Sequence, residues 1–318
     1  MNKNNFDDSL SSNNEFMETL EYSFEEEFSN SLEEYDPPTL LSFPDPGTQI
    51  KADRKKTVAE KETVDVTVIL NIWKREYLKE QLASIIGQTV VPKEIWIIHY
   101  EHHVNTQAIA DLFSDEYSGI SIIHSDKNLK YFGRFSIAIN STTKFTWLID
   151  DDIIPGKLWL EKCVNRCEAL NAIVTCSGRI IPKNDFQPEN LSGNKSVEHF
   201  IGDVKYHDFM NFSPEEVQVD YACNSYFFKT EWMSAYWSTW PATFLSGEDM
   251  HLAATCKVKL GVKTYVLAQT DFHSSGNTKK FYGADAVATW RKADFIPLRE
   301  KILRFHILEQ GWRPILWD

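Results

Sequence analysis

Long apolar runs are missing from the sequence, and cysteine is scarce. The longest apolar stretches, such as VTVILNIW, have the length of a β-strand and are far too short for a membrane-spanning helix. The chain starts with MNKNNFDDSL, which contains no apolar segment of the kind found in secretory signals. The five cysteines form no C-x-x-C pair, so the sequence indicates neither a disulfide framework nor a zinc site. These absences predict a cytoplasmic protein with reduced thiols and no membrane span.

Basic residues are fewer than acidic ones, and the acidic ones are unevenly distributed. Residues 1–50 contain twelve acidic side chains and one lysine, so they account for most of the net charge of −13. The rest of the chain is close to neutral, and therefore no basic surface for nucleic acid is indicated. Residues 1–62 are rich in Asn, Ser and Glu, and this composition predicts a disordered acidic tail. One folded domain is expected over residues 63–318.

Predicted strands and helices alternate from Val64 onward. The hydrophobic patterns predict strands over 63–73, 93–100, 120–126 and 144–150, and helices over 75–89, 106–114 and 132–142. Short connections between such elements predict an α/β fold whose central sheet is Rossmann-like, mostly parallel and flanked by helices. Ligands of these sheets bind beyond the carboxyl ends of the strands. A further amphipathic helix and tail are expected within 299–317.

Three consecutive aspartates follow the fourth predicted strand, in FTWLIDDDIIP (residues 145–155). Adjacent carboxylates repel one another, and a divalent cation such as Mg²⁺ or Mn²⁺, shared with substrate phosphates, would neutralise them. Two other interpretations are open at this point. The aspartates could form a solvated turn that caps a helix. They could also be the D-x-D motif of a haloacid-dehalogenase-like phosphatase, which forms a covalent aspartyl intermediate.

The order of several sequence blocks resembles that of the GT-A glycosyltransferases, in particular family 2. The first block is VTVILNIWKREYLKEQLASIIGQTVVPKEIWII, which is similar to the strand, basic turn, helix and Q-T pair that open the family's domain. The second is NLKYFGRFSIAINSTTKFTWLIDDD, which ends at the D-x-D position, and the third is LSGEDMHLAATCKVKLGVKTYVL, which is similar to the G-E-D block. The D-D-D and E-D blocks are also similar to the exostosin-like family 64, which shares the fold. Each motif alone is a weak signal, and their order makes them specific.

The resemblance implies a metal-dependent glycosyltransferase with a GT-A fold. Its nucleotide-sugar half would span about 63–152, its acceptor half about 153–275, and its C-terminal helix and tail 276–318. It implies transfer of a sugar from a nucleotide-diphosphate sugar, for which we expect a UDP-sugar, to a hydroxyl group of a glycan or another acceptor. The cofactor would be Mn²⁺ or Mg²⁺, and the oligomeric state stays open.

The resemblance also assigns residues to the donor and the metal. The donor-binding residues would be Trp73, Arg75, His99, Glu101, Arg134, Asp150, Asp151, Lys279 and Lys280. His99 or Glu101 would have to replace the aspartate with which many family members hold the nucleotide base. Lys279 and Lys280 belong to a loop that would close over the diphosphate. The metal ligands would be Asp150, Asp152 and His273.

On the acceptor side, the resemblance makes Asp249 the general base that removes the proton of the acceptor hydroxyl, with Glu248 beside it. Inversion at the anomeric carbon is expected, while the likeness to family 64 leaves retention open. A purely structural interpretation is that both carboxylates only stabilise the start of the helix HLAATCKVKL. Trp237 and Trp240 are expected to offer their rings to the acceptor. The alternative functions are the phosphatase named above and a catalytically silent GT-A-like protein that binds sugar.

Overall fold

The structure is a computed structural model that describes residues 61–100, 104–181, 200–201, 213–278 and 288–317. All of the described residues belong to one unit, Lys55–Asp318. The predicted acidic tail lies outside the described residues, apart from Lys61 and Glu62.

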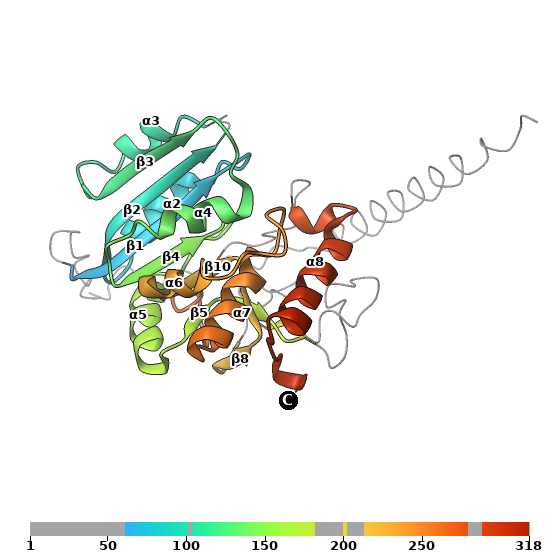
Figure 1. Cartoon of the computed structure of the whole chain (residues 1–318). Coiled ribbons are helices and arrows are strands. Elements are labelled where there is room, and N and C mark those ends of the chain that lie inside the picture. The colour runs from blue at the N-terminus through green and yellow to red at the C-terminus, as the bar shows by residue number, and fades with distance from the viewer. Residues whose placement is uncertain (1–60, 101–103, 182–199, 202–212, 279–287, 318) are drawn as a thin grey trace, which may run out of the picture. The chain divides into compact units, whose positions relative to one another are not determined.

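Eight strands of the described residues form one sheet, in the order β3-β2-β1-β4-β10-β5-β11-β8 (Figure 1). Their bounds are β1 (Thr63–Ile72), β2 (Val91–Tyr100), β3 (Ile120–Ser125), β4 (Phe145–Ile149), β5 (Ile173–Thr175), β8 (Val217–Val219), β10 (Ser225–Lys229) and β11 (Thr264–Val266). β1 is parallel to β2 and β4, β2 is parallel to β3, and β5 is parallel to β11. β10 runs antiparallel to β4 and β5, and β8 runs antiparallel to β11. The predicted mostly parallel sheet is therefore confirmed.

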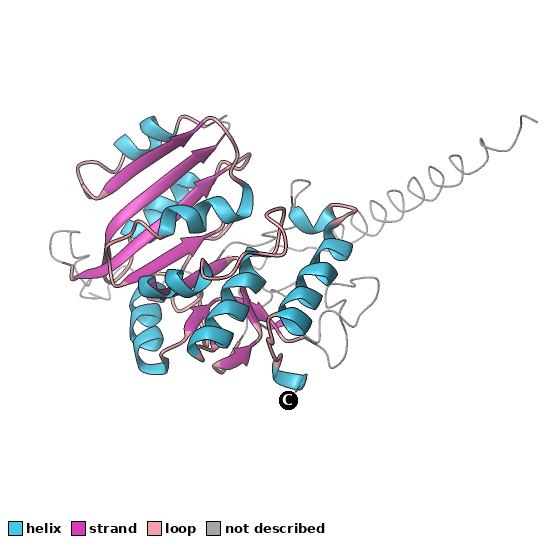
Figure 2. Ribbon diagram, viewed as in Figure 1, coloured by secondary structure: helices cyan, strands magenta, loops and turns pink. Residues whose placement is uncertain are grey.

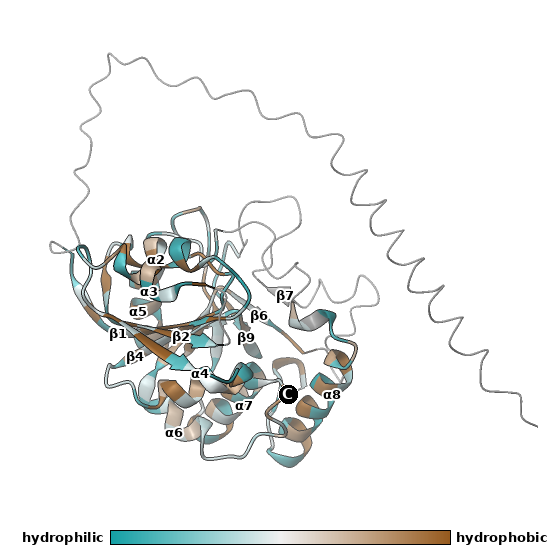
Figure 3. Ribbon diagram, turned by 90° about the horizontal axis from the view of Figure 1, so that it is seen from above, coloured by the Kyte–Doolittle hydropathy of each residue, from teal (hydrophilic) through white to brown (hydrophobic). Residues whose placement is uncertain are grey.

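Helices cover both faces of this sheet (Figure 2). Their bounds are α2 (Leu78–Ile86), α3 (Thr106–Asp111), α4 (Lys130–Ala138), α5 (Trp159–Leu170), α6 (Met233–Tyr236) and α7 (Glu248–Leu260). Figure 3 shows α2, α3 and α5 on one face and α4, α6 and α7 on the other. Residues 66–70 of β1 and 145–149 of β4 are buried without interruption. Burial on both faces explains why these two strands are almost continuously apolar instead of alternating.

A smaller antiparallel sheet and a C-terminal helix complete the described part of the domain. The sheet has the order β7-β6-β9, and the elements are β6 (Ser177–Arg179), β7 (Phe200–Ile201), β9 (Tyr221–Cys223) and α8 (Phe295–Arg304). A second hydrophobic core contains Tyr221 of β9, Met250 of α7 and Leu303 of α8. This core fixes α8 to the start of α7, and α7 carries the predicted E-D pair.

The C-terminal helix differs from the prediction in its bounds. The sequence predicts a helix and tail within 299–317, whereas α8 begins at Phe295 and ends at Arg304. A π-helical turn follows over Phe305–Glu309, and the chain then reverses at Gly311, whose φ of 76° favours glycine. The amphipathic periodicity of the sequence indicates neither the π-helical turn nor the turn at Gly311.

Two expectations based on composition can be compared with the described residues. The five cysteines are all buried and free, namely Cys163, Cys167, Cys176, Cys223 and Cys256. No helix in the part of the chain that the structure describes has both the length and the apolarity to cross a membrane.

Candidate active site

The three aspartates lie at the carboxyl end of β4, as the sequence predicts. Asp151 and Asp152 are buried, whereas the side chain of Asp150 is 27% exposed. The turn is held by Gln81 of α2, whose Nε2 donates to the carbonyls of Asp150 (2.8 Å) and Ile153 (3.0 Å). These backbone contacts fix the turn, and the carboxylates are left for other partners. The aspartates are therefore not an exposed, solvated turn.

Two non-glycine residues with left-handed backbone conformations border the aspartates. Lys74, with φ of 64°, comes directly before Arg75. Asn224, also with φ of 64°, accepts a hydrogen bond from the Asp150 N–H at 2.9 Å. Such conformations are costly for residues with a side chain and occur often at functional sites.

Arg75 is the partner of two of the aspartates. Its guanidinium pairs with Asp151, and its Nη2 lies 3.4 Å from Oδ2 of Asp152. Burial raises the pKa of Asp151 to about 7; the charge of Arg75 opposes this shift, and the charge of Asp152 adds to it. One guanidinium therefore compensates only part of the negative charge of two buried carboxylates.

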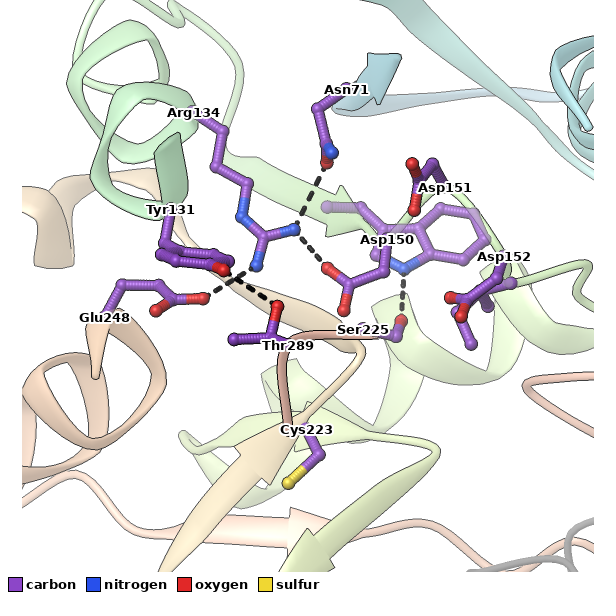
Figure 4. Close-up of polar contacts among 12 residues, drawn as sticks. Asn71, Tyr131, Arg134, Asp150, Asp151, Asp152, Cys223, Ser225, Glu248 and Thr289 are labelled. Carbon is purple, nitrogen blue, oxygen red and sulfur yellow. Dashed lines mark hydrogen bonds and ion pairs between the residues drawn. The ribbon is translucent and has the colours of Figure 1, made fainter. Parts of the chain in front are cut away.

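Arg134 of α4 joins the aspartates to the E-D pair (Figure 4). Its Nη1 pairs with Asp150 and donates to Oδ1 of Asn71 at 3.2 Å, and its Nη2 donates to Oε1 of Glu248 at 3.1 Å. Burial by itself lowers the pKa of Arg134, but the charges of Asp150 and Glu248 outweigh it and raise that pKa well above its ordinary value. The guanidinium also lies over the ring of Tyr226, 5.1 Å from its centroid. Arg134 is thus a fixed cation between the two acidic motifs.

Glu248 and Asp249 form the first turn of α7. Gly247, with φ of 86°, precedes them, and neither carboxylate acts as the N-cap. Burial raises the pKa of Glu248, as does the charge of Asp249, against the opposing charges of Arg134 and Arg299. Asp249 is held by Arg299 of α8 through two contacts, Nη1 to Oδ1 at 2.5 Å and Nη2 to Oδ2 at 2.9 Å. Each carboxylate of the pair therefore has its own arginine.

Arg299 is a site residue that the sequence analysis missed. It is 50 positions from Asp249 and belongs to no recognised block. Nothing in the helical pattern of its segment distinguishes it from a surface arginine, yet it is only 4% exposed. Only the packing of α8 on α7 brings it to the E-D pair.

The other donor residues lie at the same edge of the sheet where they are described. Trp73 is half-buried and directly follows β1, and the Lys74 ammonium is 4.5 Å from the centroid of its ring. His99 lies near the end of β2, where it pairs in register with Ile72, and its ring is 5.4 Å from that of His124. Glu101, Lys279 and Lys280 lie outside the described residues.

The donor set for a metal ion is only partly assembled. Asp150 and Asp152 offer the oxygen ligands that suit Mg²⁺ or Mn²⁺. His273 is exposed, and its carbonyl accepts from the Leu158 N–H at 2.9 Å. The residue of this segment that bonds close to the aspartates is Thr278, whose N–H donates to the carbonyl of Ile154 at 2.7 Å. Among the described residues, no group of three or more His, Cys, Asp or Glu side chains is arranged to hold a metal ion. The structure therefore does not bring His273 to the two aspartates.

The charge at this edge nevertheless fits a divalent cation. The carboxylates are those of Asp150, Asp151, Asp152, Glu248 and Asp249, and the guanidinium groups are those of Arg75, Arg134 and Arg299. When all of these groups are ionised, two negative charges have no counterpart among them. A divalent cation would supply that charge, and Asp150 is the most exposed of these carboxylates.

The two predicted acceptor residues differ in their surroundings. Trp237 is half-buried, its ring lies 4.9 Å from that of Tyr236, and its Nε1 donates to the carbonyl of Phe135 at 3.3 Å. Trp240 is 76% exposed, with the ring of Phe244 5.1 Å away. A cavity of about 650 Å³ lies beside Trp240, and its other wall is formed by α8 and the turn after it. Trp240 is thus the ring that a ligand can reach.

One family model matches the part of the chain that contains the three aspartates. The family model described as glycosyl transferase family 2 matches residues 66–231, which include Arg75, Arg134 and the three aspartates and end before Glu248. No curated protein matches the chain.

Solved structures of S. aureus TarS are similar at low identity. TarS 1-349 aligns with a TM-score of 0.43 and 15% identity over 65% of this chain and 59% of that chain. The same fragment in complex with UDP aligns with a TM-score of 0.42 and 14% identity, over the same shares of the two chains. The structure named TarS, without residue limits, aligns with a TM-score of 0.42 and 14% identity over 65% of this chain and 36% of that chain. The matched region thus spans less than two thirds of each TarS chain.

Proposed function

Because the chain belongs to glycosyl transferase family 2, we propose that it transfers a sugar from a nucleotide-diphosphate sugar to a hydroxyl group of a glycan or another acceptor. UDP-sugar is the proposed donor. The observation that carries the proposal is that Arg134 links Asp150, at the end of β4, to Glu248, at the start of α7. The motif expected to bind the donor and the motif expected to bind the acceptor therefore share one buried cation.

On the donor side, the proposal gives Asp150 to the ribose of the nucleotide and Arg75 and Arg134 to the edge that receives the diphosphate. Trp73 and His99 lie at the ends of the neighbouring strands, where the base would fit. A divalent cation, held by Asp150 and Asp152 with His273 as a further proposed ligand, would offset charge on the departing diphosphate. Glu101, Asp151, Lys279 and Lys280 complete the proposed donor set.

On the acceptor side, Asp249 is the proposed base that takes the proton of the attacking hydroxyl. A hydroxyl group is a poor nucleophile, and proton transfer to a carboxylate within hydrogen-bonding reach makes it a better one. Attack on the face opposite the diphosphate gives inversion, which we propose over retention. Glu248 lies beside Asp249 with a raised pKa, and Trp240, with Trp237 behind it, would contact the acceptor.

A thermal-shift panel of UDP-, GDP- and dTDP-sugars, with and without Mn²⁺, tests donor binding. A ligand that binds the native state raises the melting temperature by mass action, and we expect a UDP-sugar with Mn²⁺ to give the largest rise. If no nucleotide-sugar raises the melting temperature, the proposed function is wrong.

A transfer assay with the best donor then separates an enzyme from a silent sugar-binding protein. Asp249→Asn should bind the donor as the wild type does but transfer no sugar, because the amide cannot accept the proton. Asp115→Asn, which changes an exposed carboxylate on another part of the chain, is the matched control and should be fully active. Donor binding by the wild type without transfer to any acceptor of a glycan panel would favour the silent protein.

A further inference from the structure

Asp249 and Arg299 form a buried ion pair between α7 and α8. The carboxylate side chain is 12% exposed and the guanidinium side chain 5%. Both carboxylate oxygens are engaged, at 2.5 and 2.9 Å, in the parallel geometry that makes arginine–carboxylate pairs specific. Arg299 lies outside residues 66–231, which match the family model, so family membership does not account for this contact.

Arg299 itself packs against two aromatic rings. Its guanidinium carbon lies 5.3 Å from the ring centroid of Tyr221 and 5.6 Å from that of Phe295. The helix that carries it packs against the residue before the E-D pair, since a Cβ on Gly247 would come within 2.5 Å of Ile302. A cation that is fixed in this way can set the orientation of the carboxylate that it holds.

The hydrogen bonds leave one free acceptor position on a defined atom of Asp249. Oδ1 accepts from the Arg299 guanidinium and from the Met250 N–H at 2.7 Å, and Oδ2 accepts only from Arg299 among the described residues. A carboxylate oxygen can accept two hydrogen bonds. The remaining position is therefore on Oδ2, which would be the atom that receives the acceptor proton.

We infer that Arg299 is a positioning residue that orients Asp249 and compensates its charge, so that α8 completes the acceptor side of the site. The inference rests on the proposed function, because it assumes that Asp249 acts as a base. Without Arg299, Glu248 and Asp249 would face one remaining guanidinium. Burial and the charge of Asp249 would then raise the pKa of Glu248 further, so that the pair takes up a proton more readily. A protonated carboxyl group cannot accept the hydroxyl proton.

Several charged and titratable groups act on this pair. Around Glu248 and Asp249 these groups come from the turn after β4, from α4, β10 and α6, and from α8, and they are Asp150, Arg134, Tyr226, Tyr236 and Arg299. Of the two arginines among them, only Arg299 contacts Asp249. Replacement of Arg299 is therefore the change that isolates its effect on the proposed base.

The test compares Arg299→Gln and Arg299→Lys with the wild type in pH–rate profiles. Arg299→Gln should lower kcat on the order of 100-fold, as misplaced reacting groups do, and leave the KM for the donor unchanged. The acidic limb of its profile should move up by about one pH unit or more. Arg299→Lys should restore the acidic limb, because it restores the positive charge. It should restore only part of kcat, because lysine cannot make the two parallel contacts. Arg166→Gln breaks another two-contact pair, with Glu216 at 2.8 and 2.9 Å, and should keep the wild-type profile.

A second measurement does not depend on activity. In a double-mutant cycle, the melting temperatures of Arg299→Gln, Asp249→Asn and the double variant should be clearly non-additive. Additive effects would overturn the ion pair, and wild-type kcat with an unmoved acidic limb in folded Arg299→Gln would overturn its positioning role. If Arg299→Gln does not fold, the kcat of Arg299→Lys decides: a partial loss supports the positioning role, and a wild-type kcat overturns it. If the wild type transfers no sugar, the proposed function is wrong. The double-mutant cycle would still test the ion pair between Asp249 and Arg299, because it measures melting temperatures.

Discussion

Arg134 and Glu248 are 114 positions apart in the sequence, yet Nη2 of one lies 3.1 Å from Oε1 of the other in the interior. The same guanidinium pairs with Asp150. A single side chain of α4 therefore connects the carboxyl end of β4 with the start of α7. Because buried carboxylates are stable only when they are paired or protonated, both acidic motifs depend on Arg134 for the compensation of their charge.

Loss of the Arg134 guanidinium should therefore destabilise the fold. Arg134→Gln removes the guanidinium that pairs with Asp150 and Glu248, and the removal of one partner of a buried pair costs about 3–5 kcal/mol of the free energy of unfolding. Urea denaturation measures this loss. Arg304→Gln is the control, because Arg304 pairs with Glu300 at the surface and such pairs contribute about 0–1 kcal/mol. Equal stability of the two variants would show that Arg134 does not compensate buried charge.

Asp152→Asn tests the metal-dependent part of donor binding. At a donor concentration of about 100 times Kd, binding stabilises the wild type by about 2.7 kcal/mol. The variant keeps the shape of the side chain but loses its charge, so the extra thermal shift that Mn²⁺ gives with the donor should disappear. Asp65→Asn, which changes a half-exposed carboxylate that pairs with Lys93, should keep that shift. An unchanged Mn²⁺ effect in Asp152→Asn would remove this residue from the proposed metal ligands.

The sequence was most informative where local pattern and burial coincide. The first four strands were predicted to within two residues, and the aspartates were placed at the carboxyl end of β4, because long buried strands are apolar and end where polar residues begin. Arg134 was found through its motif. Its contact with Glu248 could not be predicted, since it depends on how α4 and α7 meet on one face of the sheet.

Other parts of the site carry no local signal. Arg299 sits in an ordinary amphipathic helix, and its role depends on the packing of α8 against Gly247. His273 was assigned by its position after a strand, but the register of its segment with residues 154–158 sets Thr278, and not His273, beside the aspartates. Sequence spacing from the preceding strand does not determine which residue of the segment lies there.

Trp240→Ala should weaken acceptor binding without affecting the donor. The ring is 76% exposed, so its loss should change the free energy of unfolding by less than about 0.5 kcal/mol. Ring contacts contribute about 0.5–1.5 kcal/mol, which predicts a rise of up to about tenfold in the KM for the acceptor. Initial rates measure this at a saturating donor concentration. Leu112→Ala, which removes another exposed side chain (60%), is the control, and an equal KM in both variants would exclude Trp240 from the acceptor site.

His251 of α7 and His306, two residues after α8, form a buried pair of rings behind the E-D motif. Their centroids are 5.2 Å apart, and Nε2 of His251 bonds to the carbonyl of Tyr236 at 2.9 Å. Neither nitrogen of His306 has a hydrogen-bond partner among the described residues. Burial lowers the pKa of His251 to about 4, and burial together with the neighbouring His251 lowers that of His306 to about 3. Both rings are therefore neutral in the folded protein near pH 5.

This pair should make the fold sensitive to acid. Below pH 6.5 the unfolded chain binds protons at both histidines while the folded protein does not, so stability falls as the pH decreases toward 4, by up to about 3 kcal/mol for each histidine. Asp151, with its raised pKa of about 7, acts in the opposite direction, because the folded protein takes up its proton first. Comparison of melting temperatures from pH 7.5 to 4.5 in the wild type and His306→Phe separates the two effects. The variant should lose less stability on acidification, and parallel curves would show that His306 is not buried in its neutral form.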